Sequence, residues 1–225
     1  MALLDVPVDQ DQSTRLLVRF SFCCFYTHTI HTFSITHHTK LPPGVTHYQI
    51  QLAQYSGHKH YHGFKAHALI APIGIAVHWY GPVDGRRHDS HILDCSGVLD
   101  LLPGLNIGGI NYQIYGDSAY PATPNLVIPF ARILAPPGSV RARLNEIMAI
   151  PRTCTSEWWY GIVTNTFQTL DFSRWQRQYL TCPALQYFVG MLLVNCRTCM
   201  DGGNRISDFF DTVPPSLEVY LRGDF

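Results

Sequence analysis

The stretch YQIYGDSAY, residues 112–120, decides how the middle of the chain is interpreted. Tyr112 to Tyr115 has the aromatic and branched residues of a short strand. Gly116 and Asp117 follow, at the point where this strand gives way to a turn that continues to Pro121. A side chain in this position opens at the carboxyl edge of a sheet, where α/β proteins place their sites. Asp117 is therefore the first candidate site residue.

The sequence on both sides of this stretch predicts the remaining elements. Upstream we expect one or two strands between Leu17 and Ile35, then a hairpin of Tyr61–Ala71 and Ile75–Tyr80, then a helix over Ser90–Leu102 with Asp89 as its N-cap. Downstream we expect a strand over Leu126–Phe130 and helices over Ser139–Ile150, Arg152–Leu170 and Ala184–Cys196, the first two separated by Pro151. This order predicts an α/β fold, a mixed sheet flanked by helices, as in ribonuclease-H-like proteins.

Glu157 is the second candidate, because it lies in a predicted helix beside Trp158 and Trp159. Two-metal phosphoryl transfer uses hard oxygen ligands, usually three carboxylates, around two Mg²⁺ or Mn²⁺ ions. A strand-end Asp and a helical Glu supply two of the three. Taken singly, each also has a plain structural interpretation: Asp after Gly is usually a turn residue, and a helical Glu is usually solvated.

Several motifs occur in a fixed order around these two carboxylates. They are YSGHK at 55–59 with His62 and Lys65, GPVDGRRHDS at 81–90, GDSAY at 116–120, Asn145, Arg152 ahead of EWWYG at 157–161, and PPSLE at 214–218. From about Gln54 to Leu221 the chain thereby resembles the catalytic domain of Harbinger-type transposases, which belong to the D-D-E endonuclease superfamily. The resemblance implies a ribonuclease-H-like nuclease that acts on DNA with divalent Mg²⁺ or Mn²⁺.

The resemblance also assigns roles to residues. It makes Asp117 the second catalytic Asp and Glu157 the catalytic Glu, both metal ligands, and it puts the first catalytic Asp near Phe33 to Thr39. No carboxylate occurs there, because none lies between Asp11 and Asp84. We therefore expect weak metal binding and little or no cleavage. Asp89 could take the place of the first catalytic Asp as a metal ligand. His37 or His38 could also do so, as a nitrogen ligand better suited to Mn²⁺ or Zn²⁺.

DNA would be contacted by the local basic residues Lys59, Arg86 and Arg87, although exposed loop cations are often only solvated. The whole chain has 16 Lys plus Arg and 16 Asp plus Glu, so no global positive field attracts a phosphate backbone. A helix-rich DNA-binding region, which full-length relatives carry ahead of the nuclease core, is missing from this sequence. A separate DNA-binding protein would then supply target recognition.

The last expectations concern the cellular location of the chain and its division into segments. A hydrophobic share of 46% and a charged share of 14% indicate a folded core. Seven cysteines without scaffold-like spacing, no signal segment and no long apolar run indicate an intracellular protein without a membrane role, and the transposase resemblance implies the nucleus. We divide the chain into a divergent lead-in with an altered first strand, residues 1–39, and a nuclease domain, residues 40–225.

Two other interpretations stay open. In one, the fold is a non-enzymatic scaffold, and Trp158, Trp159 and Tyr160 pack or form an interface. In the other, a misplaced exon boundary replaced the strand that carried the first Asp, since the His- and Thr-rich texture before Lys40 differs from the rest. A hydrolase triad in His88–Asp89–Ser90 is rejected because no nucleophile-elbow motif is present. Cys196 and Cys199, with Cys182 upstream, are assigned to the helical core and not to a zinc site, and Cys23 and Cys24 are assigned to packing.

Overall fold

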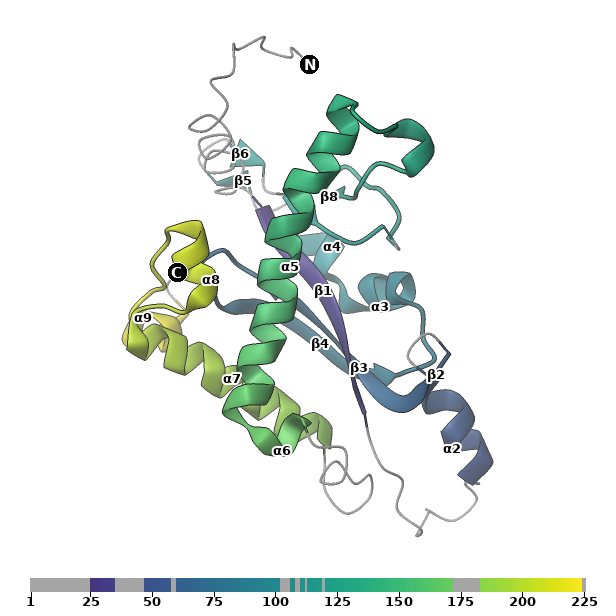
Figure 1. The fold of residues 1–225 in the computed structure, drawn as a ribbon. Helices are drawn as coiled ribbons and strands as arrows, with labels where there is room; N and C mark the ends of the chain where they lie inside the picture. The colour runs from purple at the N-terminus through teal and green to yellow at the C-terminus, as the bar shows by residue number, and fades with distance from the viewer. Residues whose placement is uncertain are drawn as a thin grey trace.

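The computed structural model describes residues 25–34, 47–57, 60–101, 106–107, 110–111, 113–118, 120–171 and 183–223 (Figure 1). The strands are β1 (Phe25–Ser34), β2 (Tyr55–Ser56), β3 (Tyr61–Ile70), β4 (Ala76–Asp84), β5 (Asn106–Ile107), β6 (Ile110–Asn111), β7 (Gln113–Tyr115) and β8 (Leu126–Val127). The helices are α2 (His47–Gln54), α3 (Asp89–Ser96), α4 (Val98–Leu101), α5 (Val140–Thr166), α6 (Gln168–Asp171), α7 (Pro183–Asp201), α8 (Arg205–Phe210) and α9 (Leu217–Arg222), with a 3-10 turn, η2, at Arg132–Leu134.

A mixed sheet forms the centre of the fold. β1 pairs with β3 in antiparallel fashion on one side and with β7 in parallel fashion on the other, and β7 pairs in parallel with β8. β3 also pairs with β2 and with β4, its hairpin partner. The predicted hairpin and the predicted strand before Asp117 are therefore confirmed. A mixed α/β arrangement of this kind is consistent with a ribonuclease-H-like fold.

The central strand β1 comes from the segment for which the sequence predicts one or two strands. β1 occupies Phe25–Ser34, the second half of that segment. It lies between the hairpin and the β7 strand, the place that the first core strand takes in this topology. The rest of the expected lead-in, residues 1–24 and 35–39, lies outside the described residues.

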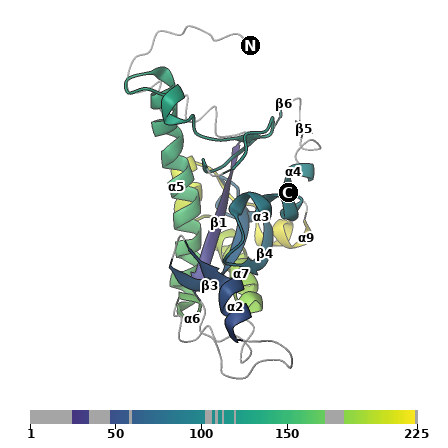
Figure 2. The same cartoon turned by 90° about the vertical axis from the view of Figure 1, so that its right-hand side faces the viewer.

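Helices cover both faces of the sheet, because side chains of a strand alternate between its faces. Ala66, Ala68 and Ile70 of β3 pack into one core cluster with residues of α5 and α7. The intervening Leu69 joins a second cluster with Leu93 of α3 and with residues of α4, β7 and β8. Figure 2 shows α5 and α3 on opposite sides of β1.

The helix α5 differs from the prediction of two helices separated by Pro151. It continues without a break for 27 residues, from Val140 to Thr166, and contacts β1 and β3. A proline inside a helix costs about 3 kcal/mol, because one backbone hydrogen bond is lost and the ring clashes with the preceding turn. Burial of Trp159, Tyr160 and Val163 on the following turns contributes about 1.5–3 kcal/mol for each large side chain. Packing therefore outweighs the local preference.

The helix predicted over Ser90–Leu102 is divided in the structure. α3 ends at Gly97, whose φ of 69° lies in the left-handed region, and α4 follows as a single turn. The predicted cap is also wrong: His88 occupies the N-cap position and makes no side-chain cap bond, while Asp89 is the first helical residue. Among the described helices, none is both long and apolar enough to cross a membrane.

Candidate active site

Asp117 lies two residues beyond the end of β7, as the sequence predicts. The N–H of Gly116 donates to the carbonyl of Val127 on β8 (2.9 Å), which fixes the chain just before Asp117. The exposed carboxylate accepts bonds from the Ser118 N–H (2.5 Å) and the Ser118 hydroxyl (3.1 Å) through Oδ1. Asp117 is thus a turn residue, and its position at the carboxyl end of a strand also suits a metal ligand.

The parallel pairing of β1 with β7 ends two residues before Asp117. Thr27 is paired with Tyr115, and the same register continued by two residues on each chain would bring Thr29 level with Asp117. β1 carries no carboxylate. The family resemblance points instead to Phe33–Thr39, of which Phe33 and Ser34 end β1 and 35–39 lie outside the described residues. Both locations lack a carboxylate.

Asp89, the expected substitute ligand, is already engaged. Its Oδ1 accepts a bond from the Nζ of Lys65 at 2.8 Å, and the same ammonium donates to the carbonyl of Arg87 at 2.7 Å. The Lys65 side chain is only 13% exposed and that of Asp89 is 36% exposed, so the pair is partly shielded from water. Asp89 therefore compensates a lysine of β3 instead of capping its own helix.

Tyr120 connects Asp89 with Asp117. Its side chain is buried in the cluster formed with Leu69, Leu93 and other apolar residues. Burial raises the pKa of the Tyr120 phenol, and the negative charges of Asp89 and Asp117 raise it further. The charges of both carboxylates therefore act on one buried phenol. The sequence motif contained Tyr120, but no pattern assigned it this position.

Glu157 lies on α5 with an exposed side chain. One turn later, the hydroxyl of Tyr160 donates to the carbonyl of Ala66 on β3 (3.1 Å), and Ala66 is paired with His31 of β1. α5 runs alongside β1 (Figures 1 and 2), and Glu157 lies three residues, about 4.5 Å along the helix axis, before Tyr160.

The two tryptophans beside Glu157 have structural contacts. Trp159 is fully buried in the core between sheet and helices. Trp158 is half-buried, with the Arg205 guanidinium 3.9 Å from its ring centroid and Phe209 in an edge-on contact at 5.8 Å. These contacts join α5 to α8 and fix the turn of helix that carries Glu157.

Asp117 and Glu157 have the right donor atoms for a divalent metal, but they are two ligands where such a site usually has three. Asp117 and Glu157 present hard oxygens, the donors that Mg²⁺ and Mn²⁺ prefer. Among the residues that the structure describes, no three His, Cys, Asp or Glu side chains gather closely enough to hold a metal ion. Asp117 and Glu157 would hold a metal, with Asp89 available only if it leaves Lys65.

The remaining candidates are placed as follows. Arg86 and Arg87 are exposed on the turn after β4, and Lys59 lies outside the described residues. Asp89, a member of the rejected His88–Asp89–Ser90 triad, bonds to Lys65. Cys199 is buried on α7 and Cys196 is half-buried, as packing thiols would be. His37, His38, Cys23, Cys24 and Cys182 lie outside the described residues.

A mixed sheet with helices on both faces and an acidic residue at a strand's carboxyl end is what a ribonuclease-H-like nuclease domain requires. Residues 37–194, more than two thirds of the chain, match the family described as DDE superfamily endonuclease. The chain belongs to this family, whose members use divalent metal ions and act on DNA. No curated protein matches the chain. No solved structure matches it either.

Proposed function

We propose that this chain is a degenerate or domesticated Harbinger-type transposase nuclease domain that keeps two of its three catalytic carboxylates. Asp117 and Glu157 are the retained pair, and the first catalytic Asp is missing. The observation that carries the proposal is the sequence gap from Asp11 to Asp84, which leaves β1 without a carboxylate. The ordered motifs from YSGHK to PPSLE support the Harbinger subtype.

The chemistry of an intact member explains why the missing ligand matters. Two divalent cations stabilise the attacking and leaving oxygens while water, and then a 3′-hydroxyl, attacks a DNA phosphodiester. Losing one of three carboxylates removes a metal ligand and one negative charge. Asp117 and Glu157 would still orient one Mg²⁺ or Mn²⁺ weakly. Cleavage is therefore slow or absent.

A plasmid-nicking assay in Mn²⁺ tests this proposal. We expect supercoiled plasmid to stay intact with the purified chain and with its Asp117→Ala variant alike. Nicking by the chain that Asp117→Ala abolishes would show an active site that is complete without the first Asp. Sequencing the transcript across codons 20–55 tests the exon-boundary interpretation, since a different reading there would restore the missing carboxylate.

The rest of the proposal concerns partners, domains and location. In this proposal residues 40–225 form the nuclease domain and residues 1–39 a lead-in with the altered first strand. Lys59, Arg86 and Arg87 contact DNA. A separate DNA-binding protein supplies target recognition, and the complex acts in the nucleus.

A scaffold without enzymatic activity is the second candidate function. α7 leaves a series of large apolar side chains partly exposed: Leu185, Phe188, Val189, Leu192 and Leu193. Exposed apolar residues grouped in this way often mark a protein contact. Capture of a DNA-binding partner that Glu157→Ala leaves unchanged would favour the scaffold. Loss of capture in that variant would count against it.

A further inference from the structure

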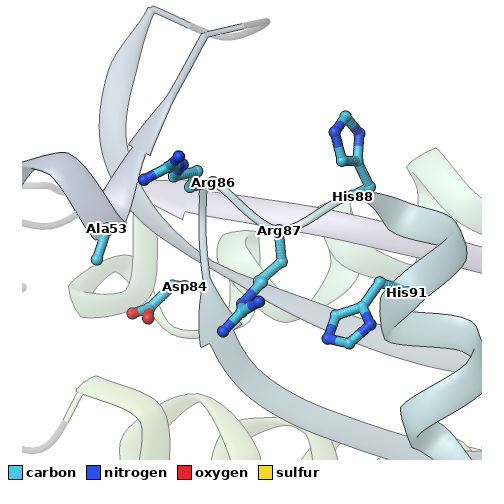
Figure 3. A pocket seen from close by; sticks show the side chains of 6 residues that line it. All are labelled: Ala53, Asp84, Arg86, Arg87, His88 and His91. Carbon is cyan, nitrogen blue, oxygen red and sulfur yellow. The ribbon is translucent and has the colours of Figure 1, made fainter.

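A cavity of about 480 Å³ lies where α2 ends, β4 ends and α3 begins. Six residues line it: Ala53, Asp84, Arg86, Arg87, His88 and His91. Figure 3 shows the guanidinium of Arg87 between the carboxylate of Asp84 and the ring of His91. The volume falls within the usual range of small-molecule sites, about 300–1,000 Å³.

Backbone bonds hold the wall of this cavity in place. The Arg87 N–H donates to the carbonyl of Asp84 (3.0 Å), closing a turn, and the Arg86 N–H donates to the carbonyl of Ala53 on α2 (3.2 Å). Between them Gly85 donates to Gly63 of β3 (2.9 Å). A Cβ at Gly85 would lie 2.6 Å from the carbonyl oxygens of Gln54 and Gly63, so only glycine fits. The two arginines are therefore presented by a fixed turn.

The charges of the lining residues favour an anion. Within the described parts of the chain, the Arg86 and Arg87 guanidinium groups form no ion pair or hydrogen bond, whereas Lys65 pairs with Asp89 and Arg197 with Asp201. The lining has two arginines and one acid, Asp84, so it carries a net positive charge without counting its histidines. α3 starts at the wall without a side-chain cap, so its first N–H groups add partial positive charge.

We propose that this cavity binds a phosphate group of a DNA strand, independently of any metal; the inference rests on the proposed function and deepens it. A guanidinium presents a planar fork of donors that matches two phosphate oxygens. His88 of the wall directly precedes Asp89, the partner of Lys65 on β3, so the cavity lies at the start of α3 and against the sheet.

Binding of a labelled random-sequence duplex, followed by fluorescence anisotropy in EDTA across a salt series, tests the cavity. We expect Arg86→Gln with Arg87→Gln to lower affinity about tenfold near 0.1 M salt and to reduce the slope of log K against log salt by about 0.9, the value for one lost phosphate contact. The control is Arg132→Gln with Arg143→Gln, which makes the same charge change at two exposed arginines outside the cavity. It should change affinity less than twofold.

A second variant shifts affinity in the other direction. Asp84→Asn removes the acid of the cavity and should tighten duplex binding severalfold, with both arginines intact. Equal affinity and slope in the two double variants would overturn the proposal, as would unchanged binding in Asp84→Asn. Thermal melting of each variant checks that the fold persists.

Inorganic phosphate, titrated calorimetrically, distinguishes the source of the phosphate. Phosphate binding that needs Arg86 and Arg87, combined with duplex binding that does not, would make the cavity a free-phosphate site and would overturn the DNA assignment. EDTA removes the metal ions that cleavage needs, so the binding measurement does not depend on whether the chain nicks plasmid in Mn²⁺. The two proposals can therefore fail separately.

Discussion

Adding a carboxylate to β1 tests whether the register of this strand or the family resemblance locates a third metal ligand. Thr29→Asp puts an acid level with Asp117, as the pairing of Thr27 with Tyr115 indicates. Ser34→Asp, the matched control, puts the same acid in the stretch that the resemblance indicates. The two positions are five residues apart, about 16 Å along a strand at 3.3 Å per residue. Metal–oxygen bonds of about 2–2.6 Å cannot span that distance.

The expected gain follows from the added ligand. A third carboxylate should tighten Mn²⁺ binding at least about tenfold, or about 1.4 kcal/mol. At a Mn²⁺ concentration ten times the dissociation constant, binding stabilises the fold by about 1.4 kcal/mol. For a chain of this size the melting temperature should rise by about 3–5 °C. The new Asp itself costs up to about 1 kcal/mol in a strand, which a melt without metal measures.

Melting curves and calorimetric titrations with Mn²⁺ give the answer. We expect Thr29→Asp to show the metal-dependent rise and Ser34→Asp to behave like the original chain. A gain in Ser34→Asp alone would refute the register argument and support the resemblance-based position. No gain in either variant would mean that Asp117 and Glu157 do not form a metal site. Adding Asp117→Ala to Thr29→Asp should remove the gain.

Three further predictions concern stability. Lys65→Met leaves the partly buried Asp89 carboxylate without its partner, and urea unfolding should show a loss of about 1–3 kcal/mol; an unchanged midpoint would show that the pair contributes nothing. Trp159→Ala empties a fully buried site and should cost about 3–5 kcal/mol in the same assay; a loss under 1 kcal/mol would contradict the packing of α5. Burial lowers the pKa of His78 from 6.5, so the unfolded chain binds its proton more readily. Stability should therefore fall as pH drops below about 6.5, and less steeply in His78→Gln; equal slopes would disprove this cause.

Local patterns in the sequence predicted the hairpin and the Asp117 turn because both depend on neighbouring residues. Glycine and proline mark the hairpin turn, and alternating apolar residues mark β3. The prediction at Pro151 was wrong for the opposite reason. Distant packing of Trp159 and Val163 decides where α5 continues, and no window around the proline contains that information.

Some features of the candidate site could likewise be predicted from the sequence and others could not. The strand-end position of Asp117 could be predicted, whereas the ion pair of Asp89 could not, because Lys65 lies 24 residues away on β3 while Asp89 begins α3. No helix was predicted at α2, which follows the turn-forming residues Pro42, Pro43 and Gly44. The cavity of Arg86 and Arg87 needs α2, β4 and α3 together, and a linear pattern shows only two adjacent arginines.

The central position of β1 has a consequence for how such a domain can change over time. β1 is held by main-chain bonds to β3 on one side and β7 on the other. Those bonds depend little on which side chains the strand carries. A foreign segment with strand-forming residues can therefore replace an inherited one and keep both halves of the sheet joined. Architecture and chemistry are separable here, and loss of the enzyme need not entail loss of the fold.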